Sequence, residues 1–86
     1  MKLSLTKSFD KGYEKLSIET QRHCDKQLLI LLKNPRHPSL RTKKVQGSRD
    51  VWEGRITKDI RFTFQIIGDT YILRRVGKHD EVLRKP

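Results

Sequence analysis

Apolar residues in the first third of the chain change from the spacing of a strand to that of a helix. Polar and apolar residues alternate over 2–6, which predicts a short strand. Phe9, Tyr13 and Leu16 then recur at helical spacing behind hydroxyl residues that can cap a helix, so a first helix is expected there. A second helix is predicted over 19–33, ended by a proline two residues later.

Strand spacing dominates after residue 36. The clearest strand is 60–67, where four apolar residues share one face while Arg61, Thr63 and Gln65 share the other. Gly68-Asp69 has the composition of a tight hairpin turn. The remaining expectations are strands over 51–57 and 71–76, a short extended segment over 40–45, a strand end at Gly77, and one irregular helical turn over 79–85.

The order of these elements is β-α-α-β-β-β, and 1–86 is a suitable length for a single domain. Strands joined by short turns pair antiparallel, and two consecutive helices with apolar stripes can cover one face of such a sheet. We therefore predict an α+β fold in which an antiparallel sheet carries a two-helix hairpin packed on one face. The other face is expected to be open to solvent.

The charge of the chain points to its partners. Twenty Lys and Arg against ten Asp and Glu give a formal net charge of +10. Residues 33–86 hold fourteen of the basic and six of the acidic side chains, a net of +8, whereas 1–32 hold six and four, a net of +2. Because like charges repel, this concentration favours a polyanionic partner over the alternative of a surface that is merely rich in lysine.

Several kinds of site and location are disfavoured. The chain has no Gly-rich phosphate loop, and its histidines, His23, His37 and His79, are scattered, so we predict no metal site and no organic cofactor. Cys24 is the only cysteine, which rules out an internal disulfide. The longest apolar stretch, 28–32, is too short to span a bilayer, and the first residues lack the apolar run of a signal peptide. We therefore expect a cytoplasmic location without membrane contact.

Basic side chains on the predicted strands are the unusual feature. Arginines on strands usually face solvent, so we expect them on the open face of the sheet, where they would form a basic platform. Ordinary outward-facing positions are the alternative, and the spacing does not distinguish RNA, DNA or an acidic protein as the partner. The platform would consist of Arg55, Arg61, Arg74 and Arg75, edged by Lys43, Lys44, Lys58 and Lys78.

Four stretches of the chain resemble the RelE/ParE toxin superfamily. They carry, in order, a glycine, an aromatic residue, an Arg-Ile pair, a strand with an internal arginine, and a Gly-x-His ending. Two helices closed by Asn34-Pro35 also fit, so the resemblance covers nearly the whole chain. The stretches are Val45–Gly47, Val51–Thr57, Asp59–Phe64 and Tyr71–Asp80.

The resemblance implies the toxin of a type II toxin–antitoxin pair. RelE-like members cut mRNA in the ribosomal decoding site, whereas ParE-like members poison DNA gyrase. The expected partners are therefore a cognate antitoxin together with mRNA and the ribosome.

The resemblance also implies site residues. Arg61 matches the strand arginine that RelE-like nucleases place at the scissile phosphate, and His79 falls where the family has an Arg or His acting as acid or phosphate ligand. Arg55 and Asp59 fall where the YafQ branch has a functional His and Asp.

Two departures from the family pattern concern the same site. Trp52 and Gly54 stand where RelE-like enzymes have two lysines, and Leu83 replaces a functional aromatic residue. Lys43 or Lys44 can supply the missing charge from the preceding segment.

Cleavage of RNA without a metal needs three kinds of group: a base for the 2′-hydroxyl, an acid for the leaving 5′-oxygen, and cations for the phosphoryl oxygens. Arginine suits the last task because its planar fork stays ionised, and histidine suits proton transfer because it titrates near neutral pH. We assign Arg61 to the transition-state charge and His79 to the acid. The RNA backbone would be held by Arg55, Lys43, Lys44, Lys58 and Lys78, with Trp52 as a stacking face or, alternatively, as a core residue.

Two further functions stay open at this point. A gyrase-directed, non-nucleolytic toxin is favoured by the missing lysine pair and disfavoured by His79 and Arg61. A basic module that only binds its antitoxin would need neither residue for chemistry.

Overall fold

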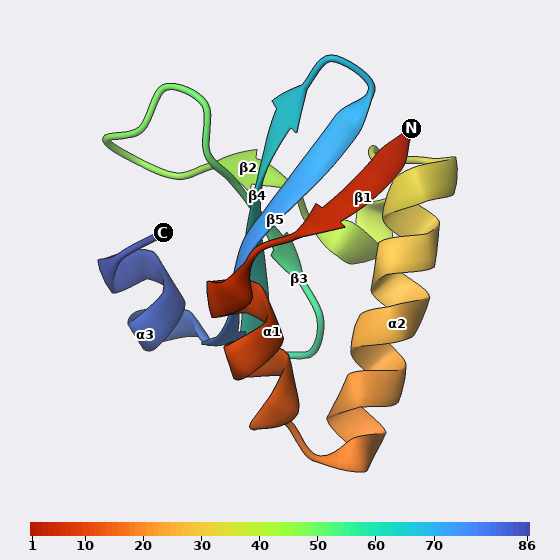
Figure 1. The fold of residues 1–86 in the computed structure, drawn as a ribbon, viewed down its shortest axis with the longest axis vertical. Helices are drawn as coiled ribbons and strands as arrows, with labels where there is room; N and C mark the ends of the chain where they lie inside the picture. The colour runs from red at the N-terminus through yellow and green to blue at the C-terminus, as the bar shows by residue number, and fades with distance from the viewer.

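The computed structural model describes residues 1–86 and arranges them around one five-stranded sheet (Figure 1). The spatial order of the strands is β1-β5-β4-β3-β2, so the short strands β1 and β2 form the two edges. The elements are β1 (Lys2–Leu5), α1 (Lys7–Glu14), α2 (Ile18–Lys33), the 3-10 helix η1 (Pro38–Leu40), β2 (Lys43–Lys44), β3 (Trp52–Arg55), β4 (Ile60–Ile67), β5 (Thr70–Lys78) and α3 (His79–Arg84). The predicted α+β class is confirmed, and the predicted order β-α-α-β-β-β is extended by the two-residue strand β2 and the helix α3.

Both long helices begin at residues that the sequence favours for this role. The Thr6 side chain accepts a hydrogen bond from the Phe9 amide, and the Ser17 side chain accepts one from the Thr20 amide. Helix α2 ends at Asn34, whose extended backbone precedes a proline. The two helices run antiparallel along one side of the sheet, as predicted (Figure 1).

The sheet is mixed rather than fully antiparallel. Strands β2 to β5 pair antiparallel with their neighbours, but β1 pairs parallel with β5, in the register Leu3 to Tyr71. Parallel strands need a long connection, and here it comprises everything between β1 and β5, namely the two helices and strands β2 to β4. The β4–β5 hairpin turns at Gly68, whose φ of 59° favours glycine.

Three predicted boundaries are wrong. The strand expected over 51–57 is shorter, Trp52–Arg55. Within the extended segment expected over 40–45, Leu40 ends η1, Arg41 has a positive φ of 45°, and only Lys43–Lys44 form a strand. Strand β5 does not end at Gly77 but continues to Lys78, because Gly77 pairs with Arg61 through the backbone.

The core lies between the sheet and the α1–α2 pair. Phe9 and Leu31 from the helices are fully buried against Phe62, Phe64 and Leu73 of the central strands. None of the helices combines the length with the apolar composition that spanning a bilayer requires.

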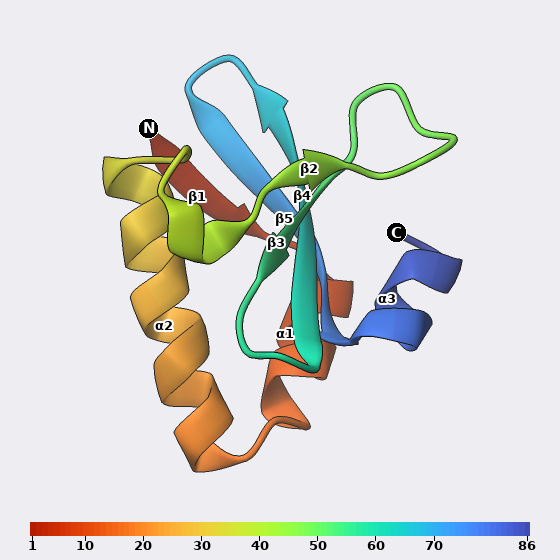
Figure 2. The same ribbon diagram turned by 180° about the vertical axis from the view of Figure 1, so that it is seen from behind.

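The second face of the sheet is partly covered, which corrects the expectation of an open face. Helix α3 packs against β4 and β5 on the side of the sheet opposite α2 (Figure 2). Val82 of α3 is buried, and Thr63 of β4 is fully buried and donates a hydrogen bond from its hydroxyl to the Pro86 oxygen at 3.1 Å. We call this side of the sheet the α3 face.

Candidate active site on the alpha3 face

The strand register decides which side chains share the α3 face. Glu53 lies opposite Thr63, and Arg55 lies opposite Arg61. Because directly opposed residues on neighbouring strands project to the same side, Glu53, Arg55 and Arg61 all project to the α3 face with Thr63.

A hollow of about 500 Å³ opens on this face between β2, β3 and α3. Four of its lining residues carry ionisable groups suited to proton transfer or charge stabilisation, namely Lys43, Lys44, Glu53 and His79. Leu83 of α3 forms part of its wall. We call it the Glu53 hollow.

Glu53 is the central acidic group of the hollow. Only 4% of the residue is exposed, and its Oε1 lies 3.8 Å from the Nζ of Lys43, whose side chain is 70% exposed. The two residues occupy opposite positions of β2 and β3, so the backbone pairing holds them together. A nearly buried carboxylate beside an accessible cation can accept a proton from a ligand that enters the hollow.

His79 begins α3, and its position follows from the backbone. Its amide donates to the Asp59 oxygen at 3.1 Å, which ties the start of α3 to the β3–β4 turn. The side chain is 47% exposed, and its Nδ1 lies 3.4 Å from Asp80 Oδ1. This leaves Nε2 as the ring nitrogen available to a ligand.

Arg61 is held by the β3–β4 turn. One of its terminal nitrogens, Nη1, donates to the oxygens of Thr57 at 2.7 Å, Lys58 at 2.8 Å and Ile60 at 3.3 Å. Its guanidinium thus neutralises a group of carbonyl dipoles, and its remaining N–H groups make no hydrogen bond within the protein. Arg55, directly opposite, has no ion-pair partner.

The structure therefore gathers four of the predicted residues at one end of the α3 face. Arg55 and Arg61 are opposed, Arg61 pairs with Gly77 just before His79, and Asp59 contacts the His79 amide. Lys43 lies on the same face, where it forms an ion pair with Glu53. Glu53 was not among the residues predicted for the site. Its ion pair with Lys43 and its position beside His79 in the hollow follow from the pairing of β2 with β3.

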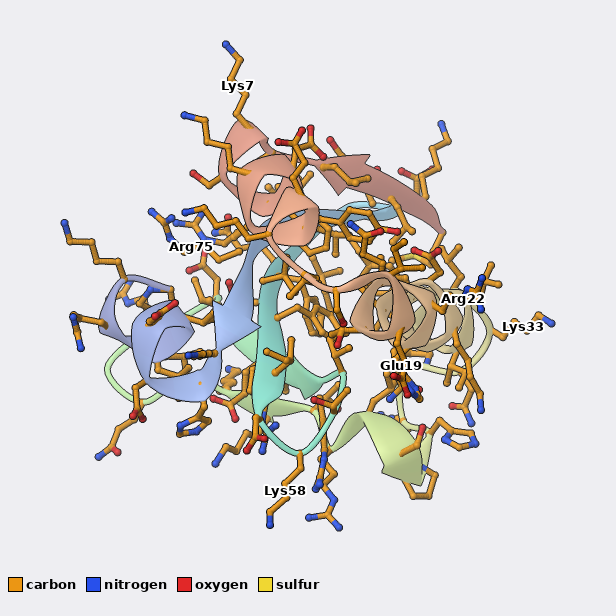
Figure 3. The ribbon with its side chains drawn as sticks, turned by 90° about the horizontal axis from the view of Figure 1, so that it is seen from below. Lys7, Glu19, Arg22, Lys33, Lys58 and Arg75 are labelled. Atoms are coloured by element: carbon orange, nitrogen blue, oxygen red, sulfur yellow. The ribbon has the colours of Figure 1, made fainter.

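Other predicted residues lie elsewhere. Trp52 packs against the hydrophobic core on the helix-covered face. The ammonium of Lys44, a residue that also lines the Glu53 hollow, lies 5.5 Å from the centroid of the Trp52 ring. Lys58 projects from the β3–β4 turn, as Figure 3 shows. Lys78 lines a different hollow, between α1 and α3. The continuous basic platform expected from the sequence is thus divided.

Arg74 is also engaged within the protein. Its Nη1 donates to Gln65 Oε1 at 2.7 Å and its Nε donates to the Pro86 oxygen at 3.0 Å. The bond to Pro86 holds the segment after α3 against the sheet, and the bond to Gln65 joins β5 to β4.

No group of three or more His, Cys, Asp or Glu side chains gathers where it could hold a metal ion. The shifted ionisable groups lie outside the hollow. Burial raises the pKa of the Cys24 thiol to about 12, and a hydrogen bond to Asp25 raises the pKa of Tyr13 to about 12.

Comparison with solved structures identifies relatives of this fold. A copper-bound mutant toxin from Helicobacter pylori superposes with a TM-score of 0.81 and 29% identity, over 95% of this chain and 98% of that one. The YoeB/ParE toxin from Agrobacterium tumefaciens gives 0.79 and 20%, over 92% and 99%. The intact E. coli RelBE toxin–antitoxin complex gives 0.72 and 22%, over 90% and 94%. No protein-family model and no curated protein matches the sequence.

Proposed function

We propose, from the premise that the chain has the fold of the RelE/ParE toxin superfamily, that it is the toxin of a type II toxin–antitoxin pair. We further propose that it inhibits translation by cleaving mRNA, on the ribosome, without a metal ion. The observation that carries this proposal is the Glu53 hollow, whose lining combines a carboxylate, two lysines and a histidine.

The groups around the hollow match the needs of phosphodiester cleavage by the substrate's own 2′-hydroxyl. Glu53 accepts the 2′-hydroxyl proton while the 2′-oxygen attacks phosphorus. His79 donates a proton to the 5′-oxygen as its bond to phosphorus breaks, which leaves a 2′,3′-cyclic phosphate and a free 5′-hydroxyl. After this step Glu53 is protonated and His79 is deprotonated. The same two groups can therefore hydrolyse the cyclic phosphate, with His79 as the base and Glu53 as the acid.

Cations on the α3 face stabilise the extra negative charge of the transition state. Lys43 lies at the rim beside Glu53, and Arg55 lies on the same face without an ion-pair partner. Arg61 contributes through its free N–H groups while its Nη1 keeps the turn in place. Arginine and lysine stay charged at cellular pH, which suits this electrostatic role.

The remaining candidates have supporting roles in this proposal. Asp59 positions the start of α3 through its backbone oxygen. Lys44 and Lys58 flank the face and would contact phosphates of a longer RNA, as would Lys78 on the far side of α3. Trp52 is proposed as a core residue rather than a stacking platform, because its ring packs against the core.

The test is expression of the wild type and of Glu53→Gln and His79→Ala in growing cells, with mRNA 5′ ends mapped. We expect the wild type to arrest growth and to create new 5′ ends, and both variants to relieve both effects. Asp69→Asn, in the distant β4–β5 turn, is the matched control and should behave as the wild type. Growth arrest without new ends would point to gyrase, and harmless expression would point to a module that only binds its antitoxin.

A further inference from the structure

The Glu53 hollow contains groups that the proposed cleavage does not use. Beside its charged residues, the hollow is lined by Val45, Gln46 and Leu83. Gln46 is the only side chain of the lining that carries both a donor and an acceptor and never a charge. Figure 2 shows the loop between β2 and β3, which carries Gln46, on the same side of the sheet as α3.

The backbone around Gln46 forms a closed turn. The Val45 amide donates to the Val51 oxygen at 2.9 Å, and the Ser48 amide donates to the Val45 oxygen at 3.1 Å. Gly47 occupies the turn with a φ of 85°, a conformation that favours glycine. Because these contacts hold the backbone of Gln46, little backbone entropy is lost when its side chain binds a ligand.

The second half of the same loop is attached to the sheet through side chains. Asp50 Oδ2 accepts a hydrogen bond from Gln65 Nε2 at 2.9 Å. Gln65 Oε1 accepts one from Arg74 Nη1 at 2.7 Å. This chain of bonds joins the loop to β4 and β5, so the loop is held at both ends.

Gln46 differs from the other three glutamines of the protein. Gln21, Gln27 and Gln65 all donate hydrogen bonds to acceptors within the protein. The Gln46 side chain is exposed and makes no hydrogen bond within the protein. Its amide N–H and its amide oxygen are therefore both available to a ligand in the hollow.

The chemistry of an amide selects one base of RNA. A glutamine presents a donor and an acceptor side by side, so it pairs with a ligand edge that presents an acceptor and a donor in the same way. Adenine has this pattern in N7 and its N6 amino group, whereas guanine presents two acceptors on the same edge and pyrimidines have no N7. Proteins read this edge in single-stranded RNA, where the bases are unpaired.

The place of Gln46 in the fold selects one nucleotide. Gln46 follows the end of β2, the strand that holds Lys43 opposite Glu53. In the proposed cleavage Glu53 receives the 2′-hydroxyl proton, while His79 acts on the leaving 5′-oxygen from α3. The base nearest Gln46 is therefore that of the nucleotide that carries the attacking 2′-hydroxyl, and the partly exposed Leu83 offers its ring an apolar contact.

We propose that Gln46 is a specificity-determining residue, which binds N6 and N7 of an adenine on the 5′ side of the scissile phosphate. This inference rests on the proposed function for the position of the scissile phosphate. It deepens that function by naming the substrate class, single-stranded RNA with an adenine directly before the cleaved bond.

The experiment measures binding without cleavage. The probes are four fluorescent tetranucleotides, UXUU, in which X is A, G, C or U and every 2′-hydroxyl is replaced by fluorine, so that no nucleophile is present. We expect anisotropy titrations of the wild type to give an adenine Kd about tenfold below the other three. A fifth probe with 7-deazaadenine, which lacks N7, should bind as weakly as the guanine probe. Equal affinity for all bases, or no binding of any probe, would overturn the inference.

Two substitutions of Gln46 test the residue itself. Gln46→Ala should remove the preference for adenine and the effect of 7-deazaadenine together. Gln46→Glu keeps an acceptor for N6 but loses the donor to N7, so it should also bind adenine and 7-deazaadenine equally. Lys44→Ala, in the same hollow, is the matched control and should weaken all four probes by the same factor, because an ammonium attracts phosphates regardless of the base. An adenine preference that survives Gln46→Ala would reject the assignment.

Cleavable RNA separates this inference from the proposed nuclease. We expect cleavage by the wild type to fall after adenines, and cleavage by Gln46→Ala to spread over all four bases. Selective binding of adenine without any cleavage would reject the nuclease and leave the base site intact. Cleavage with no preference for adenine, in binding or in position, would reject the base site and leave the nuclease.

Discussion

Glu53 and Lys43 face each other across the β2–β3 pair, with Oε1 and Nζ 3.8 Å apart. The pairing is asymmetric, because the glutamate is almost fully buried while the lysine side chain is 70% exposed. Removing the carboxylate charge therefore leaves the lysine solvated, whereas removing the lysine leaves a buried carboxylate without its cation. Variants of Glu53 are for this reason the cleaner probes of chemistry.

Glu53→Gln should abolish most of the proposed cleavage without unfolding the protein. The amide keeps the size of the carboxylate but cannot accept the 2′-hydroxyl proton, so we expect a loss of about 10²–10⁴-fold in the single-turnover rate. The midpoint of urea unfolding should change little. A rate equal to that of the wild type would remove Glu53 from the proposed chemistry.

Arg61→Ala should destabilise the protein as well as impair cleavage. The substitution removes the donor to the oxygens of Thr57 and Lys58, and we expect a loss of about 1–3 kcal/mol in the free energy of unfolding. Arg61→Lys restores a charged donor and should recover part of this stability. If urea titration shows no loss for Arg61→Ala, the turn does not depend on the guanidinium.

Gln27→Leu should destabilise the connection between α2 and β3. The buried Gln27 side chain donates through Nε2 to the Arg55 oxygen at 2.9 Å and to the Ser39 oxygen at 3.2 Å. Leucine leaves both acceptors without this donor, at a cost of about 1–3 kcal/mol. Chemical unfolding measures this cost, and a fully stable variant would contradict it.

Gly12→Ala should be poorly tolerated although it lies in a helix. A Cβ at this position would clash with the Val76 backbone oxygen, so α1 must move away from β5 at a cost of about 1–3 kcal/mol. The exposed Ser8→Ala in the same helix serves as the control and should leave the melting temperature nearly unchanged. Equal melting temperatures for both variants would show that α1 adjusts freely.

Cys24 should be inert in the folded protein. It is fully buried, and burial raises the pKa of its thiol to about 12, so little thiolate exists at pH 8 and none of it is accessible. Ellman's reagent should therefore react only as fast as the protein opens, and immediately in urea. Fast reaction under native conditions would place the thiol at the surface.

Much of the fold follows from local patterns in the sequence. Strand β4 occupies the predicted 60–67 because its apolar and polar residues alternate and a glycine turn follows it. The caps of α1 and α2 are likewise local. In each, a side-chain hydroxyl accepts a hydrogen bond from the backbone amide three residues later. The type of pairing at β1 is not local, because it depends on where the chain returns after two helices.

The site was less predictable for physical reasons. Glu53 lies between an aromatic residue and a glycine, and only its register with Lys43 and Thr63 shows that it lines the hollow. Helix α3 has few apolar residues, with Val82 and Leu83 alone facing the protein, so no amphipathic pattern predicted that it would cover the sheet. The roles assigned to Arg61 and His79 remain predictions, although the structure brings them near each other.

The register between β4 and β5 skips one residue. Thr63 pairs with Arg75 and Phe64 pairs with Leu73, so Arg74 is an extra residue that forms a bulge. Leu73 and Val76 are consequently both buried although they are three positions apart. Residues after the bulge therefore face the side of the sheet opposite to the one that simple alternation from Leu73 would give. Deletion of one residue at the bulge would move the start of α3, with His79, towards the helix-covered face of the sheet. An alignment of distant homologues that omits a gap at this bulge would therefore equate residues from opposite faces, and functional assignments transferred through it would be displaced by one position.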